Sequence, residues 1–184
     1  MKTLFYIGFI ILLASCTVLN TGKSSANSFE KPIYNAIFAF ADSNNVMYFI
    51  CDTFVMEALD GYTINMFNKK AYRFLKESKE PKINIHDTAI IDTIYTFSDT
   101  RNTIQFYRAG HNDFIFAFDV VNSKLNLKRS IKTGMSKGDF IKKFNIVESI
   151  GKEVQIENVD GTLKFNFQFE KNKLKRINAF LYID

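Results

Sequence analysis

The stretch 160–184, DGTLKFNFQFEKNKLKRINAFLYID, decides the fold of this chain. From residue 163 every second side chain is apolar: Leu163, Phe165, Phe167 and Phe169. A second run of the same period places Ile177, Ala179, Leu181 and Ile183 on one face, and Phe180 and Tyr182 on the other. A period of two is typical of strands with one buried face. We therefore predict two antiparallel strands joined by a turn at 171–173, with one face against helices and the other partly uncovered.

The pair Asp160-Gly161 opens this stretch. Asp-Gly favours a two-residue hairpin turn, because both central residues of that turn need a positive φ. The pair therefore predicts another strand before residue 160.

The segment 131–144 predicts a short helix. Gly134 ends the preceding segment, Ser136 can cap the helix by accepting a backbone hydrogen bond, and Asp139 suits the positive end of the helix dipole. We expect the helix to span residues 137–144 and to bury Phe140, Ile141 and Phe144.

Farther toward the N-terminus, three runs at 90–97, 103–108 and 113–121 predict an antiparallel meander, with Phe114, Phe116, Phe118 and Val120 on one face. A fourth strand is predicted at 124–131. Apolar residues at helical spacing predict an amphipathic helix over 64–76 that ends before Pro81. Residues 46–54 predict a strand, and 33–41 fit a helix or a strand equally.

Together these elements predict an α+β domain over 32–184, in which an antiparallel sheet of six to eight strands has helices on one face. The order helix then strands occurs twice, so the domain divides into two possible units, 32–131 and 132–184. The chain is 47% hydrophobic and carries 20 Phe and no Trp, a composition that excludes a disordered protein. Its net charge of +5 is modest and acidic residues interleave with the lysines, so no nucleic-acid partner is expected.

The N-terminus has the pattern of a secretory signal. Lys2 precedes an apolar run, residues 4–13, that is too short to span a bilayer. Leu13-Ala14-Ser15-Cys16 follows and resembles the lipobox of bacterial lipoproteins, in which the Cys is acylated and becomes the first mature residue. The resemblance implies a signal peptide at 1–15, a lipid such as palmitate on Cys16, and a polar tether over 16–31. An uncleaved anchor helix, or cleavage without lipidation, is the alternative.

That resemblance also implies an outer-membrane location. Thr17, Val18 and Leu19 follow the Cys in place of the acidic cluster found in many surface-exposed lipoproteins, so a periplasm-facing position is expected.

No catalytic motif stands out. With Cys16 acylated, Cys51 has no partner in the chain, and its apolar neighbours predict a buried thiol. His86 and His111 are too few for a familiar zinc site, and His111 with Asp113 fits a turn better than a metal centre. The carboxylates Asp52 and Glu57 could pair for glycoside cleavage only if a cleft held them. We expect no cofactor, no metal and no enzymatic activity.

The segment 131–137, its short helix and the closing hairpin at 169–177 resemble the helix-plus-meander unit of BamE-type outer-membrane lipoproteins and of β-lactamase inhibitory protein. Members of that fold class bind proteins through an open sheet face. The resemblance implies a non-catalytic protein-interaction module that serves envelope assembly or maintenance.

Two alternatives stay open: an inhibitor or immunity-type lipoprotein, and a lipoprotein that binds or processes carbohydrate. For carbohydrate, the aromatic rings of Tyr107, Phe180 and Tyr182 are the candidate binding groups, against the competing role of packing in the sheet.

Overall fold

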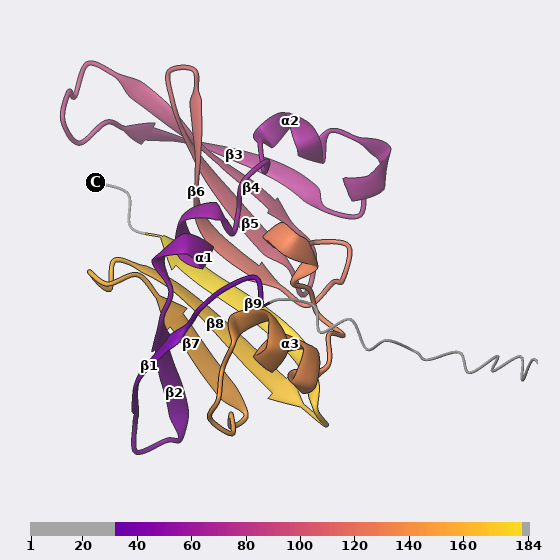
Figure 1. Cartoon of the computed structure of the whole chain (residues 1–184). Helices are drawn as coiled ribbons and strands as arrows, with labels where there is room; N and C mark the ends of the chain where they lie inside the picture. Colours follow the sequence, from indigo (N-terminus) through magenta and orange to yellow (C-terminus); the bar gives the residue numbers. More distant parts are fainter. Residues whose placement is uncertain (1–31, 182–184) are drawn as a thin grey trace, which may run out of the picture. The chain divides into compact units, whose positions relative to one another are not determined.

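The computed structural model describes residues 32–181, which belong to one compact unit of mixed α and β structure (Figure 1). Its nine strands are β1 (Ile37–Ala41), β2 (Val46–Ile50), β3 (Lys76–Ile83), β4 (Ile91–Ser98), β5 (Thr103–Ala109), β6 (Asn112–Val120), β7 (Glu153–Glu157), β8 (Leu163–Glu170) and β9 (Lys173–Leu181). Its helices are α1 (Asp52–Glu57), α2 (Ile64–Phe67) and α3 (Lys137–Phe144), with single 3₁₀ turns at Lys70–Tyr72 and Lys128–Ser130. The predicted α+β class is confirmed, although the sheet has nine strands rather than six to eight.

All nine strands form one sheet in the order β1-β2-β7-β8-β9-β6-β5-β4-β3. Every neighbouring pair is antiparallel except β2 and β7, which run parallel from Val46 opposite Glu153 to Ile50 opposite Glu157. The parallel pair is not part of the predicted meander, because it joins segments separated by about a hundred residues and no local pattern marks it. Pairing of β6 with β9 joins the strands of the two predicted units into the same sheet.

The two strands predicted at the C-terminus are confirmed as β8 and β9. The tight two-residue turn, however, joins β8 to β9 and does not lie at Asp160-Gly161, where the sequence predicted it. Lys171 and Asn172, between β8 and β9, both have positive φ (49° and 60°), as a two-residue hairpin turn requires. Asp160-Gly161 instead lies in the longer connection from β7 to β8, where of the two residues only Gly161 has a positive φ. There the Asn158 side chain, which accepts a hydrogen bond from the Leu163 N–H at 2.9 Å, shapes the loop.

Helix α3 begins and ends where the sequence predicts. The Ser136 hydroxyl accepts a hydrogen bond from the Asp139 N–H at 3.0 Å, so one free amide of the first turn is paired. Asn145 ends the helix in the left-handed conformation, with its own N–H bonded back into the last turn. Phe140 and Phe144 are fully buried, whereas Ile141 is half-buried.

Much of the core consists of aromatic rings from the helices packed on aromatic rings of the sheet. On β8, the buried rings of Phe165 and Phe167 receive Phe54 of α1 at centroid distances of 5.0 and 5.9 Å. Phe140 of α3 packs on Phe167 at 4.9 Å and on Phe169 at 5.1 Å. Each such side chain removes a large apolar surface from water, so this cluster contributes much of the stability.

A second aromatic cluster lies under the other half of the sheet. Phe67 of α2 stacks on Phe97 of β4 at 4.6 Å and meets Phe106 of β5 edge-on at 5.6 Å.

The predicted helix over 64–76 is wrong beyond its first turn. Lys69 adopts an extended conformation (φ −74°, ψ 151°) that stops α2, and Lys76 already begins β3. The apolar spacing arose from side chains that reach the core from a turn rather than from one helix face.

Three further predictions are corrected. Residues 46–54 divide into β2 and the start of α1. Residues 124–131 form a turn and a 3₁₀ turn, although Leu125, Leu127 and Ile131 are fully buried as their alternation suggested. Phe114 does not share a face with Phe118, because a bulge shifts the β5–β6 register so that Phe114 lies opposite Tyr107 and Phe118 opposite Ile104. Of the stretch 33–41, which fitted a helix or a strand equally, residues 37–41 form the strand β1, and residues 33–36 form neither a helix nor a strand.

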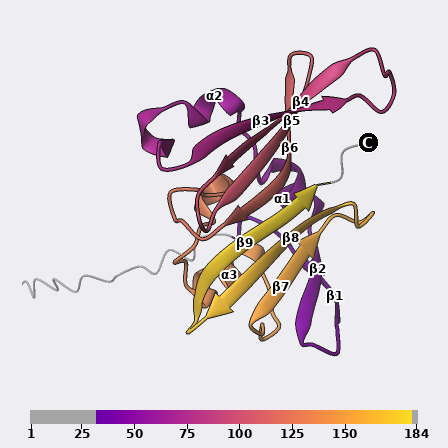
Figure 2. The same ribbon diagram turned by 180° about the vertical axis from the view of Figure 1, so that it is seen from behind.

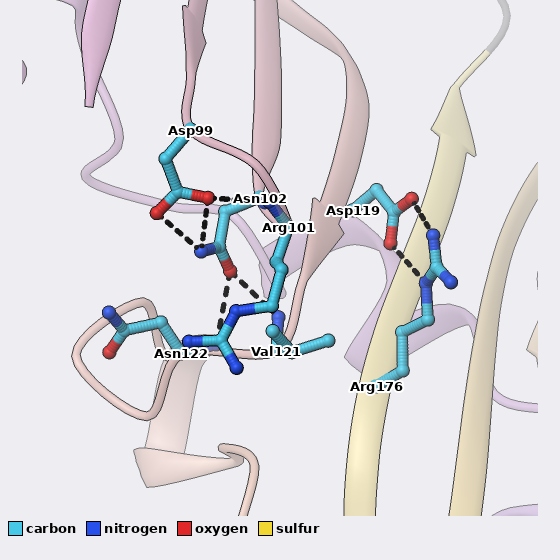
Figure 3. A network of polar contacts seen from close by, with 7 residues as sticks. All are labelled: Asp99, Arg101, Asn102, Asp119, Val121, Asn122 and Arg176. Carbon is cyan, nitrogen blue, oxygen red and sulfur yellow. Dashed lines mark hydrogen bonds and ion pairs between the residues drawn. The ribbon is translucent and has the colours of Figure 1, made fainter. Parts of the chain in front are cut away.

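Hydrogen bonds and an ion pair of polar side chains connect neighbouring strands and turns (Figure 3). The buried Asn102 donates its side-chain amide to Asp99 at 2.9 Å and accepts from the Val121 N–H at 2.8 Å, so the β4–β5 turn is tied to the end of β6. Burial by itself would raise the pKa of Asp99, but hydrogen bonds from the Arg101 and Asn102 amides hold it below the usual value. On the sheet itself, Arg176 of β9 forms a two-pronged ion pair with Asp119 of β6.

Replacing Phe167 with Ala tests the role of the first aromatic cluster. Phe167 is fully buried and contacts both α1 and α3, so its loss leaves a cavity that the neighbouring rings cannot fill. We expect the free energy of unfolding to fall by about 3–5 kcal/mol. Denaturant unfolding of both proteins measures this difference, with Phe180→Ala, at an exposed position, as a control that costs less than about 1 kcal/mol.

Candidate functional site

The two edges of the sheet differ in chemistry. At one edge, β3 has the sequence KESKEPKI and every residue is exposed. Its lysines, its glutamates and Pro81 are the features by which proteins prevent a sheet edge from pairing with another chain. The β3 edge is thus protected against strand addition.

The opposite edge, β1, has the sequence IFAFA and is also exposed along its whole length. It carries no charged residue and no proline. Ile37 and Phe40 are 68% and 51% exposed, and one side of the Phe40 ring stacks on Tyr48 at 4.2 Å. Among the described strands β1 pairs only with β2, and an exposed, uncharged edge strand of this kind offers backbone groups and apolar side chains to an incoming strand. We refer to Ile37–Ala41 as the β1 edge.

A pocket of about 640 Å³ lies where β6 separates from β9. The two strands pair from Ala117–Phe180 to Val120–Ile177, and the preceding residues of β6 pair only with β5 among the described strands. The β3–β4 and β5–β6 hairpins extend past the end of β9 (Figure 1). The walls of the pocket come from six strands and the β3–β4 loop: Lys82, Ile83, Asn84, Ile85, His86, Ile94, Tyr107, Ala109, Phe114, Ile115, Phe116, Leu163 and Leu181. We refer to this as the fork pocket.

Most of the described lining of the fork pocket is apolar, and one carboxylate orients two of its polar residues, Asn84 and Tyr107. Asp92 is only 3% exposed and accepts hydrogen bonds from the Asn84 side-chain amide at 2.7 Å and from the Tyr107 hydroxyl. The hydrogen bond to Asp92, with partial burial, raises the pKa of Tyr107 above its usual value. Asp92 therefore fixes the direction of two side chains that line the pocket.

The structure places the sequence-predicted residues as follows. Tyr107 lines the fork pocket, half-buried. Phe180 is 63% exposed and lies in the sheet between Ala117 and Lys164. Tyr182 and the acylation candidate Cys16 lie outside the described residues, as do the signal at 1–15 and the tether at 16–31.

Other candidate groups have structural partners. Cys51 is buried, as predicted, and burial raises the pKa of its thiol. Asp113 forms an ion pair with Arg108 at 2.6 Å, and the pair does not include His111. Asp52 accepts from the Val159 N–H at 2.8 Å, while Glu57 accepts from the Tyr34 hydroxyl at 2.6 Å. Within residues 32–181, no group of three or more His, Cys, Asp or Glu is placed to hold a metal ion.

Sequence reasoning missed the fork pocket, the β1 edge and the role of Asp92. The pocket depends on where β6 leaves β9, which only the register defines. The sequence does show that residues 37–41 are uncharged and contain aromatic residues. It does not show that these residues lie at the edge of the sheet.

Comparisons with known proteins identify no relative, since no protein-family model, curated protein or solved structure matches the chain. In the part of the chain that the structure describes, none of the helices has the length and apolar character needed to cross a membrane.

Replacing Asp92 with Asn tests the network in the fork pocket. An amide carbonyl carries no full charge, so it opposes ionisation of the Tyr107 hydroxyl less than the carboxylate does. We expect the pKa of Tyr107 to fall toward the ordinary value of about 10. The tyrosine ring carbons, followed by NMR against pH, measure it, with Tyr107→Phe to assign the signal.

The raised pKa of Tyr107 also determines how the stability of the fold depends on pH. Because folding raises the pKa of Tyr107, the stability that this hydrogen bond adds is present below the unfolded pKa of about 10 and is lost as the pH rises through the folded value. Asp160→Asn in the β7–β8 loop serves as the control and should leave Tyr107 unchanged. An unaltered Tyr107 pKa in Asp92→Asn would contradict the assignment.

Proposed function

We propose that the chain is a lipid-anchored protein of the bacterial cell envelope, whose domain binds another protein and catalyses no reaction. The observation that carries the proposal is the contrast between the uncharged, exposed β1 edge and the charged, proline-containing edge at β3. Protecting one edge and leaving the other open is expected where the open edge has a use. The use that best fits is addition of an extended strand from a partner protein.

The proposal includes the finer prediction that helices cover one face and leave the other open. The pairing register supports it, because Phe49, Ile156, Phe165, Ala179 and Phe118 follow one another across neighbouring strands and all five are buried. The same register gives a polar row on the opposite face: Tyr48, Gln155, Asn166, Asn178 and Asp119. Figure 2, seen from behind, shows β7, β8 and β9 in front of the described helices. The division into two tandem helix-plus-meander units stays a prediction.

The anchor rests on Leu13-Ala14-Ser15-Cys16 and the polar stretch after it. With Cys16 acylated, a tether over 16–31 reaches at most about 55 Å when fully extended. The β1 edge begins six residues after that tether ends, so a partner beside the membrane would be within reach. We propose an outer-membrane location with the domain in the periplasm, in envelope assembly or maintenance.

One observation favours a carbohydrate-binding function as the second candidate. Phe180 is exposed on the polar face, with Lys164 opposite it and Asn178 two residues before it, and an exposed ring beside hydrogen-bonding groups suits a sugar. An inhibitor or immunity role is a variant of the first candidate, since it also requires a protein partner.

Replacing Cys16 with Ala tests the anchor. Without a thiol the acyl chain has no attachment point, so we expect the protein to move from the membrane fraction to the soluble fraction and to lose label from an alkyne palmitate. Cys51→Ala is the matched control and should stay labelled and membrane-bound. Label that persists in Cys16→Ala would exclude this residue as the anchor.

Replacing Ile37 and Ala39 with Lys tests the β1 edge. Both residues are exposed, so the fold should persist, while two lysines at the edge oppose strand addition. We expect recovery of the crosslinked partner to fall at least tenfold. The control is Val147→Lys with Val159→Lys, the same charge change at exposed apolar loop positions.

Quantitative affinity capture from crosslinked envelopes compares the two double variants, with thermal melts to verify folding. Equal recovery of the partner from both would refute a role for the β1 edge. Capture of no stoichiometric protein, together with retention on a glycan column that Phe180→Ala abolishes, would favour the second candidate.

A further inference from the structure

We infer that the fork pocket binds a single-chain anionic amphiphile of the fatty-acid class, with the acyl chain between β6 and the ends of β8 and β9 and the carboxylate at Lys82. This site is separate from the β1 edge and goes beyond the function proposed above. It also does not depend on acylation of Cys16.

The size of the fork pocket and its apolar lining are the first evidence for this ligand. A pocket of about 640 Å³ falls in the range, roughly 300–1,000 Å³, in which proteins hold small molecules. The inner wall consists of half-buried apolar side chains from strands distant in sequence: Ile94, Ile115, Phe116, Leu163 and Leu181. Such a wall favours an apolar ligand, because each methylene group that enters the pocket is removed from water.

The rim adds apolar surface that the protein leaves in water. Ile83 and Ile85 are 58% and 69% exposed, and Phe114 across the opening is 47% exposed. These three residues would lie over a chain that leaves the pocket. Their exposure therefore continues the apolar surface outward, as an elongated ligand requires.

Charge selects the head group. Among the lining residues that the structure describes, the only charged or titratable ones besides Tyr107 are Lys82 and His86, which are both exposed, and none of these described residues is acidic. The nearby carboxylate of Asp92 already accepts hydrogen bonds from Asn84 and Tyr107. A described lining with a lysine and no carboxylate is complementary to an anionic head and not to a cationic one.

The competing occupants fit less well. A strand from a second copy or another protein could pair with the residues of β6 before Ala117, but such a strand would be recognised through its backbone and would not account for the basic rim. A neutral apolar ligand would leave Lys82 without a role. The amphiphile uses both the apolar wall and the basic rim.

Titration calorimetry with laurate, below its micelle concentration, tests the site. The core described above lies within residues 32–181, so a chain of residues 17–184, which lacks Cys16, is the form to use. We expect saturable binding of one laurate per chain. Lauryl alcohol, which has the same chain and a neutral head, should bind more weakly.

Two variants with matched controls separate the wall from the rim. Ala109→Phe adds a ring at the pocket wall and should weaken both ligands at least tenfold, whereas Ala117→Phe on the same sheet, outside the lining, should not. Lys82→Glu should weaken laurate about fivefold and leave lauryl alcohol unchanged, because only the charge contact is reversed. Lys76→Glu, the same change on the same strand away from the pocket, should affect neither ligand.

Thermal melts show which variants remain folded. If Ala109→Phe does not fold, Lys82→Glu still tests the site, because residue 82 is at an exposed position of the edge strand. Absence of saturable laurate binding would overturn the inference, as would equal effects of Lys82→Glu and Lys76→Glu. Binding that appears only after removal of residues 182–184 would assign the pocket to the chain's own C-terminus and would also overturn it. None of these outcomes bears on the β1 edge, whose variants are measured separately.

Discussion

Burial of the phenylalanine face of β8 is the interaction on which the rest of the structure depends. Phe165, Phe167 and Phe169 lie near the middle of the nine-stranded sheet, and rings from α1 and α3 pack on them. Helix α3 has eight residues and α1 has six, too few for either to be stable alone, so docking on these rings is what keeps them folded. The same burial fixes the register of β8, because a shift by one residue would expose every ring.

A fixed register at β8 determines what lies at the two ends of the sheet. Its neighbours β7 and β9 lead outward, through β2 to β1 on one side and through β6 to β3 on the other. The edge strands are thus chemically unlike because they come from different segments, an apolar one after residue 36 and a charged one before residue 84. Just before the β1 edge, the N–H groups of Tyr34 and Ala36 donate hydrogen bonds to carbonyl groups at the end of α3. These bonds attach the start of β1 to the core.

The fork pocket arises from a second consequence of the same arrangement. Strands β3 to β6 extend beyond the end of β9, and the bulge in β6 turns Phe114 toward the side of Tyr107. Apolar side chains that would otherwise be covered by a neighbouring strand are left to line a cavity, and the buried Asp92 holds Asn84 and Tyr107 in place. None of the described residues that line the pocket lies on β1 or on its neighbour β2.

The sequence by itself determined the parts with strong local signals. Alternation indicated the strands β4 to β6, β8 and β9, and the cap at Ser136 indicated the start of α3. It also supplied the lipobox resemblance at Cys16, on residues outside the described part of the chain. Only the tertiary structure decided the rest: the parallel pairing of β2 with β7, the replacement of the helix over 64–76 by short turns and β3, the bulge near Phe116, and the convergence of Lys82, Tyr107 and Leu181 on one pocket. The physical reason is range, because periodicity reports how a residue relates to its near neighbours, whereas strand order and cavities depend on contacts between segments far apart along the chain.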